Sequence, residues 1–253
     1  MIGFFKTILF IPLYNLLIFI TSIIPGADLG LAIIVLTILV KLVIFPLYKK
    51  SVRTQIKLKS VEPKLKEIKE KYKDNLPEQS RQTMEIYRQE KINPFSTILV
   101  LLIQIPIIIT LYYVFRDSFN VHTDLIYSFV SAPSQINTNF LGWFDLTANK
   151  SIVLSVLTGL SQYLQVRFSL PTQPKSKNKL GESFKDDLMR SMDLQMRYFM
   201  PLITVFIAFT LPSAIAVYWV TSNSFSAIYE MVVIKKIKKE AELITPKVSE
   251  KTG

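Results

Sequence analysis

The apolar residues of this chain are gathered in long blocks rather than spread in amphipathic periods. A bilayer core of ~30 Å needs about 20 predominantly apolar residues in a helix, so blocks near that length are candidate membrane spans. The blocks predict spans at about 29–48, 95–115, 151–168, 198–211 and 214–234. We therefore expect an all-α membrane protein with a five-helix core over residues 28–234.

The last apolar stretch, 198–234, is too long for one span, because a straight helix of that length would rise by ~55 Å. We expect the break at Leu211-Pro212-Ser213, since proline interrupts a helix. The fourth helix is then short, at ~21 Å, which predicts local thinning of the bilayer.

The first segment, residues 1–27, is apolar but is interrupted by Lys6, Pro12 and the polar pair Tyr14-Asn15. A cleaved signal peptide is one interpretation, although the end of the run offers a poor cleavage site. A sixth span is another, because the length suffices. We favour an interfacial helix, since a polar pair near the middle and an interrupting proline suit a half-immersed segment.

Residues 49–93 are strongly polar and follow the anchor pattern Tyr48-Lys49-Lys50. Apolar residues recur there at spacings of three and four, which predicts an amphipathic helix, at Leu58, Val61, Leu65, Ile68 and Tyr72. Asp74-Asn75 breaks the pattern, and Pro77 is well placed to start a second helix. The segment is therefore predicted to be a cytoplasmic helical hairpin.

The positive charge is distributed very unevenly along the chain. Of the 30 Lys and Arg, 13 lie in 49–93, 7 in 167–197 and 6 in 235–253. By the positive-inside rule, the hairpin, a second loop at 170–197 and the basic tail at 235–253 are cytoplasmic. A pI near 9.6 would also suit nucleic acid, but this distribution follows the membrane, so we expect no specific DNA binding.

The usual signatures of cofactor and metal chemistry are missing from the sequence. It has no cysteine, one histidine (His122) and no glycine-rich phosphate loop. We therefore expect no cofactor and no metal site.

Lys41 is the sharpest polar feature, because it is the single charge inside the apolar span 29–48. A lysine near the centre of a span costs ~2.5–3.5 kcal/mol on insertion scales. One interpretation is snorkelling, in which the long side chain carries the ammonium to the inner headgroups. The other is a functional cation in a wet pocket.

Other spans supply polar side chains that favour the pocket. Those of the third span recur at spacings of four and three and form one face: Ser151, Ser155, Thr158, Gln162 and Gln165. The fifth span is rich in hydroxyls and amides. Polar faces in lipid must meet each other or water, so these features predict a hydrophilic, positively charged groove. Gln104 is weaker, because a lone amide is as often an interhelical hydrogen bond.

Four co-linear segments resemble signature regions of the YidC/Oxa/Alb membrane protein insertases: LTILVKLVIFPLYKK (36–50), SVEPKLKEIKEKYKDN (60–75), KINPFSTILVLLIQIPIIITLYYVF (91–115) and LPSAIAVYWVTSN (211–223). The resemblance covers about residues 10–235 and implies a short bacterial core of that family. It implies a non-enzymatic insertase of the bacterial inner membrane, without cofactors. Its partners would be nascent membrane proteins and the lipid bilayer, with the ribosome and the Sec translocon as further candidates.

The resemblance also implies roles for residues of the groove. Lys41 falls where the family usually has arginine, Thr37 falls on the family's threonine, and Gln104 with Pro106 matches the motif of the second span. The full set of expected groove residues is Lys41, Thr37, Gln104, Gln162, Gln165, Tyr218, Trp219 and Ser222. Gln162 and Gln165 fit only approximately, so which of them faces the groove is left open.

Two departures from the family pattern stand out. Lysine at 41 keeps the charge but not arginine's planar fork, and the second span begins NPFSTILVLL, without the small residues and proline expected there. Two alternative functions also compete. One is a small anion transporter or channel built around Lys41, although no internal repeat supports it. The other is a non-catalytic membrane assembly subunit that docks through the hairpin.

Overall fold

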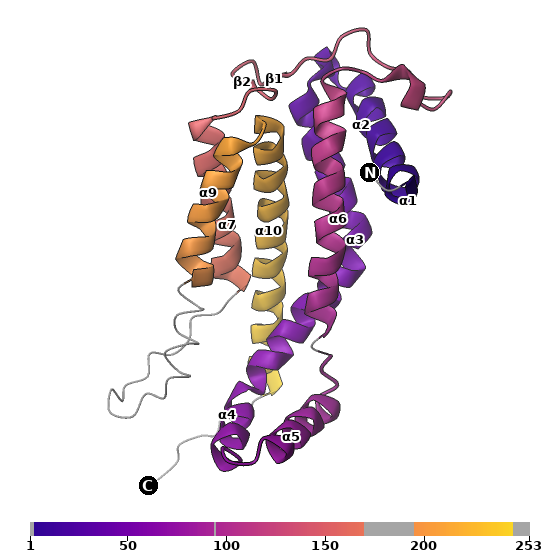
Figure 1. Ribbon diagram of the computed structural model, residues 1–253. Coiled ribbons are helices and arrows are strands. Elements are labelled where there is room, and N and C mark those ends of the chain that lie inside the picture. Colours follow the sequence, from indigo (N-terminus) through magenta and orange to yellow (C-terminus); the bar gives the residue numbers. More distant parts are fainter. Residues whose placement is uncertain (1–2, 94, 170–194, 245–253) are drawn as a thin grey trace. The chain divides into compact units, whose positions relative to one another are not determined.

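The computed structural model describes residues 3–93, 95–169 and 195–244, and it is mostly helical. The chain divides into two compact units, one made of 1–13 and 39–114 and the other of 14–38 and 115–253 (Figure 1). Most of the expected second loop, at 170–194, and the end of the basic tail, at 245–253, lie outside the described residues.

The first unit contains α1 (Gly3–Phe5), the π-helical turn η1 (Lys6–Phe10), α4 (Glu62–Lys71) and α5 (Leu76–Gln89). It also holds the later part of α3 (Leu29–Ser60) and most of α6 (Phe95–Ser118). α3 does not end where its apolar stretch ends but runs on to Ser60. The physical reason is that residues 49–60 contain no glycine or proline, and leaving an apolar environment does not itself stop a helix.

α4 and α5 are joined by the short turn at 72–75 and contact each other. Asn75 caps α5, because its Oδ1 accepts a hydrogen bond from the backbone N–H of Glu78 at 3.2 Å. Gln79 donates to the carbonyl of Lys69 at 3.1 Å and so ties the two helices together. The expected break at Asp74-Asn75 and the proline at the start of the second helix are both present.

The second unit contains α2 from Tyr14 onward (α2 is Ile11–Ile23), the 3₁₀ turns η2 (Pro25–Ala27) and η3 (Thr123–Leu125), and the early part of α3. It continues with strands β1 (Asn139–Phe140) and β2 (Phe144–Asp145), α7 (Ile152–Ser169), the π-helical turn η4 (Gln195–Phe199), α9 (Met200–Thr210) and α10 (Ser213–Ile244). The expected break after Leu211 is present, since α9 ends at Thr210 and α10 begins at Ser213.

Tyr14 and Asn15 of α2 are buried. The Asn15 side chain donates to the carbonyl of Leu125 at 2.8 Å and accepts from the N–H of Tyr127 at 2.7 Å. The Tyr14 hydroxyl accepts from the N–H of His122 at 2.8 Å. The polar pair therefore holds the segment 122–127 through its backbone, and the interfacial location of this helix stays a prediction.

α7 packs closely against α9 and α10 in the second unit. At Gly159 an added Cβ would lie 2.2 Å from Cγ2 of Val205 on α9, so only glycine allows this approach. The opposite side of α7 exposes large apolar side chains, namely Ile152, Val153, Val156, Leu157, Leu160 and Leu164. On this helix Ser155, Thr158 and Ser161 are buried, whereas many of the large apolar residues are exposed.

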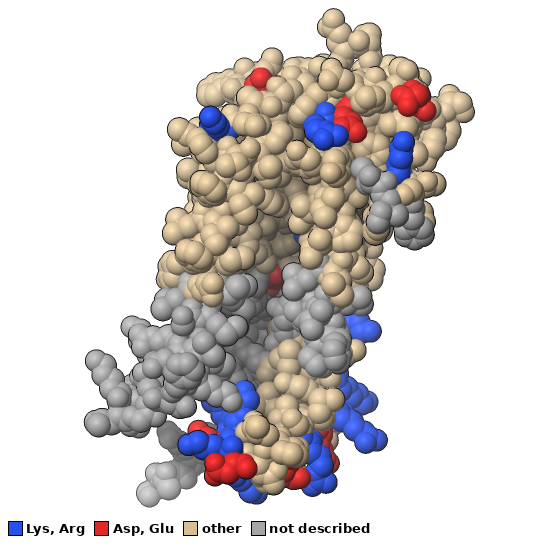
Figure 2. Space-filling model, in the orientation of Figure 1, with Lys and Arg blue, Asp and Glu red and all other residues tan. Residues whose placement is uncertain are grey.

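Two helical stretches within the described residues are long and apolar enough to cross a membrane by length and composition, Lys6–Ile23 and Leu29–Leu58. Arg197–Thr210 is a shorter apolar helix. On the face shown in Figure 2, the surface over α7 and α9 carries no charge along most of its length. Large exposed apolar patches mark surfaces that contact a membrane or another protein.

Candidate functional site

Lys41 lies on α3 in the first unit and is half-buried. Its Nζ sits over the ring of Tyr48, 5.7 Å from the ring centroid. Tyr48 is two helical turns further along α3, next to Lys49 and Lys50, so the ammonium leans toward the polar end of the helix. The cation–π contact offsets part of the cost of desolvating the ammonium. The Lys41 side chain points toward the end of the span, as a snorkelling lysine does.

Thr37 and Gln104 have different surroundings, each within its own unit. Thr37 is 1% exposed, and its hydroxyl donates to the carbonyl of Ile33 at 2.6 Å. A threonine that bonds back to the preceding turn has its donor occupied, so only its oxygen lone pairs remain for a ligand. Gln104 lies on α6 and is half-exposed, two residues before Pro106.

Three polar contacts join α7 and α10 in the second unit. The Thr158 hydroxyl approaches the carbonyl of Ala216 at 3.4 Å, and the Asn223 amide donates to the Ser161 hydroxyl at 3.2 Å. Gln165 Nε2 donates to Glu230 Oε1 at 3.5 Å.

The α7 residues of these contacts are three and four positions apart, whereas those of α10 are seven apart. A heptad spacing keeps successive contacts on one seam between two helices. Part of the expected polar face of α7 therefore packs against α10. Ser155 and Thr158 of this face are buried. Gln162 and Gln165 remain half-exposed at the same end of α7.

Glu230 is a residue that the sequence reasoning missed. It is 3% exposed and is the single charged residue between positions 198 and 234. The signal was available, because a charge inside an apolar span is the same feature that drew attention to Lys41. Its carboxylate adds one acid to the neutral hydroxyls and amides of this part of α10.

The aromatic pair of α10 is divided between two environments. Tyr218 is buried, and its ring lies 6.2 Å from that of Phe115 at the end of α6, so it is a packing residue. Trp219 is half-exposed and Ser222 is buried. Of the expected groove residues in this unit, the side chains of Gln162, Gln165 and Trp219 are therefore the more accessible ones.

The chain was also compared with known proteins. A family model described as 60Kd inner membrane protein matches residues 19–240. Proteins named membrane protein insertase YidC from Francisella tularensis subsp. novicida (strain U112) and subsp. tularensis (strain WY96-3418) are each 34% identical over 209 residues. Each alignment covers 81% of this chain and 32% of the relative, so the chain spans about a third of their length.

The fold is similar to a solved structure described as an active YidC insertase with its first transmembrane domain resolved. The TM-score is 0.57 at 23% identity, and the match covers 89% of this chain and 46% of the other. At this identity the likeness concerns the fold alone. With most of its length matched by the family model, and with its mostly helical fold, the chain belongs to the 60Kd inner membrane protein family, the family of YidC and Oxa.

Proposed function

We propose that this chain is a membrane protein insertase, which helps nascent membrane proteins to enter and fold in the bilayer. The observation that carries the proposal is the family match over residues 19–240, with curated relatives that are named insertases. The exposed apolar faces of α7 and α9 support it further, since a helix leaving the insertase needs a lipid-facing surface to follow.

The topology we propose has five spans, formed by α3, α6, α7, α9 with η4, and α10. The distribution of Lys and Arg supports a cytoplasmic location for α4 and α5, for 170–197 and for the tail at 235–253. The location we propose is the inner membrane of a bacterium, as the family description suggests. The segment 119–150 then lies on the outer side.

In the mechanism we propose, Lys41 attracts the acidic or polar outer segment of a client. A partner of opposite charge offsets the desolvation of a segment on its way through the membrane. Gln104 in the first unit, and Gln162, Gln165 and Trp219 in the second, each offer hydrogen bonds to polar segments of a client. The client's apolar helix meanwhile moves into lipid. These steps make and break no covalent bond, so the proposal includes no enzyme activity and no cofactor.

The short fourth helix supports a lowered energy barrier for the passage of a polar client segment through the bilayer. η4 (5 residues) and α9 (11 residues) together rise by only ~24 Å, less than the ~30 Å of a typical bilayer core. A thinned bilayer shortens the path of a polar segment. The ribosome and the Sec translocon are further partners within this proposal, since they deliver clients in an extended state.

A rescue experiment tests the proposal. Bacterial cells depleted of their own insertase would express this chain and a small single-span client with an acidic outer segment. We expect the client to become protected from added protease in the manner of an inserted protein, and growth to recover. Absence of client insertion, with the chain present in the membrane at the level of the host insertase, would contradict the proposal.

A further inference from the structure

The tip of the hairpin formed by β1 and β2 projects apolar side chains outward. Trp143 is 87% exposed and Leu141 is 60% exposed, although both are large. The tip, defined as Leu141-Gly142-Trp143, contains no charged residue. A solvent-facing turn normally carries Asn, Asp, Gly or Ser, so this composition asks for an explanation.

The backbone of the tip makes the choice of leucine more unusual. Leu141 has φ +53° and Gly142 has φ +74°, and the N–H of Trp143 donates to the carbonyl of Phe140 at 3.1 Å. Two consecutive positive φ angles define a type I′ turn, whose first central position favours Asn, Asp or Gly. Leucine there is strained, because in the left-handed region its Cβ lies too close to the following carbonyl oxygen. The leucine at this position therefore makes the turn less stable than Asn, Asp or Gly would.

The hairpin is held firmly at the ends of the helices of its unit. Asp28 accepts hydrogen bonds from Leu31, in the first turn of α3, and from Leu141, at 3.0 and 3.2 Å. The ring of Phe140 packs where a side chain at Gly30 would lie. These contacts fix the tip beyond the start of α3.

The other side of the hairpin is tied to α10. Leu146 and Ala148 accept hydrogen bonds from Ala214 and Ser213 at the start of that helix, at 3.1 and 3.0 Å. A tip fixed at two helices projects its side chains in one direction, so Leu141 and Trp143 do not depend on a flexible loop for their exposure.

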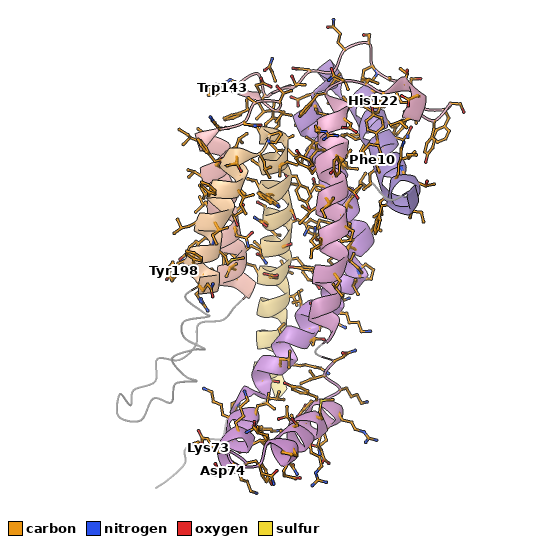
Figure 3. All side chains as sticks on the ribbon, viewed as in Figure 1. Phe10, Lys73, Asp74, His122, Trp143 and Tyr198 are labelled. Carbon is orange, nitrogen blue, oxygen red and sulfur yellow. The ribbon has the colours of Figure 1, made fainter. Side chains whose placement is uncertain are left out.

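Further large apolar side chains are exposed in the same unit. Figure 3 shows Trp143 near the end of the group of α7, α9 and α10 where α10 begins, and Tyr198 in η4, at the opposite end of α9. Between them the outer faces of α7 and α9 expose apolar side chains such as Ile152 and Phe206. Tyr198 forms an aromatic pair with Tyr163, with ring centroids 6.1 Å apart. Aromatic residues at both ends of an apolar belt are typical of the two membrane–water interfaces.

We propose that Leu141 and Trp143 anchor this unit in the headgroup region of the outer leaflet. The proposal rests on the topology proposed above, in which segment 119–150 is outside. Because η4 and α9 are shorter than a typical bilayer core, the tip reaches the boundary between headgroups and acyl chains, where indole is favoured. The anchor fixes the position of the short α9 helix along the membrane normal.

The fluorescence of tryptophan tests the anchor, because the chain has only two, Trp143 and Trp219. A Trp219→Phe variant in vesicles reports on Trp143 alone. We expect blue-shifted emission that loses roughly half its intensity to phosphatidylcholine brominated close to the headgroup, as for a side chain ~5–10 Å deep in the interface. The control is Lys73→Trp in a Trp143→Phe/Trp219→Phe background, which should show red-shifted emission and no quenching by lipid.

A second probe exploits the absence of cysteine from the sequence. A nitroxide on Leu141→Cys should show a ratio of oxygen to nickel-complex accessibility between that of Phe206→Cys, facing lipid, and that of Lys73→Cys, facing water. A ratio equal to that of Lys73→Cys would overturn the anchor. Blue-shifted Trp143 emission that depends on protein concentration and resists brominated lipid would also overturn it, in favour of a second protein copy.

A turn variant separates anchoring from folding. Leu141→Asn relieves the strained turn, so thermal stability in detergent should be unchanged or higher. In vesicles, the quenching of Trp143 by brominated lipid should fall by about half, because one of two anchoring side chains is gone. Unchanged quenching would contradict a role for Leu141. Trp143 fluorescence, nitroxide accessibility and thermal stability are all measured without a client. They would therefore still test the anchor if the insertase proposal failed.

Discussion

The amide nitrogen of Gln165 on α7 lies 3.5 Å from a carboxylate oxygen of Glu230 on α10. The contact lies between the two helices, whereas the outer side of α7 exposes apolar side chains. The contact is the last of three polar contacts along the seam between the two helices. An acid at this depth requires hydrogen bonds to be tolerated. Glu230 places a carboxylate near the side chains of this unit that we propose to bind client segments.

Replacement of Glu230 separates its charge from its packing. Glu230→Gln keeps the size and the hydrogen-bonding oxygen, so we expect little change in stability. Glu230→Leu leaves the Gln165 amide without this acceptor and should destabilise the chain by about 1–3 kcal/mol. Thermal unfolding in detergent measures both. The matched control is Ser224→Leu on the exposed side of α10, and an equal loss there would contradict the role of the contact.

Substitutions at Lys41 distinguish client attraction from snorkelling. If the ammonium attracts acidic segments, Lys41→Arg retains insertion of an acidic client and Lys41→Glu reduces it strongly, because like charges repel. The protease-protection assay in depleted cells provides the measurement. Equal insertion by Lys41→Ala would favour snorkelling, in line with the lean of Nζ toward Tyr48. Tyr48→Phe is the control, since it keeps the ring under the cation.

Asn15 should matter more for the loop at 122–127 than for α2 itself. Asn15→Leu keeps the size and the apolar character of the helix but removes two hydrogen bonds to backbone groups, with a cost of about 1–3 kcal/mol. We expect faster amide hydrogen exchange at Tyr127, whose N–H now lacks the Asn15 oxygen. Ser22→Ala provides a control, since the Ser22 hydroxyl bonds only within its own helix at Phe19. Unchanged exchange at Tyr127 would contradict the assignment.

The approach of α7 to α9 depends on Gly159. Gly159→Ala would place a methyl group against Val205, and overpacking of this kind typically costs about 1–3 kcal/mol. Because the shortest approach is to Cγ2 of Val205, with the Pro201 carbonyl oxygen further away at 3.2 Å, Gly159→Ala combined with Val205→Ala should recover part of the loss, as coupled neighbours do. The measurement compares the unfolding temperatures of the two single variants and the double variant. A double variant that is as unstable as the sum of the two singles would show that the contact is not the cause.

Glu78 gives α5 a dependence on pH. Hydrogen bonds from Arg81 and then from Gln82 lower the pKa of Glu78 below its ordinary value of 4.5. The folded helix therefore gains from the ionised carboxylate at pH values above about 4.5, and this gain is lost as the pH falls through the lower pKa of the folded state.

A nitroxide on Ser80→Cys should become more mobile as the pH falls below that value. High salt should reduce the effect, since the ion pair is exposed. In Glu78→Gln the same probe should show no transition in this range. A transition of equal size in that variant would assign it to another group.

Several features could be predicted from the sequence because they depend on local chemistry. The apolar blocks, the break at Leu211-Pro212-Ser213 and the turn at Asp74-Asn75 follow from residues that are neighbours along the chain. The family was recognisable from four segments for the same reason. The sequence predicts a span that ends at Tyr48, and α3 itself continues to Ser60. Hydropathy marks the limit of an apolar environment, and helix ends depend on caps and breakers instead.

What only the tertiary structure decided is the use made of each polar residue. Tyr14 and Asn15 could face a membrane surface or a protein segment, and only the fold brings 122–127 to them. The polar face of α7 could line a groove or pack against another helix. In the fold, Ala216, Asn223 and Glu230 of α10 form hydrogen bonds with side chains of this face. Sequence alone determined that these polar groups need hydrogen bonds in an apolar surrounding. The partner that supplies each bond comes from distant parts of the chain, and periodicity carries no information about it.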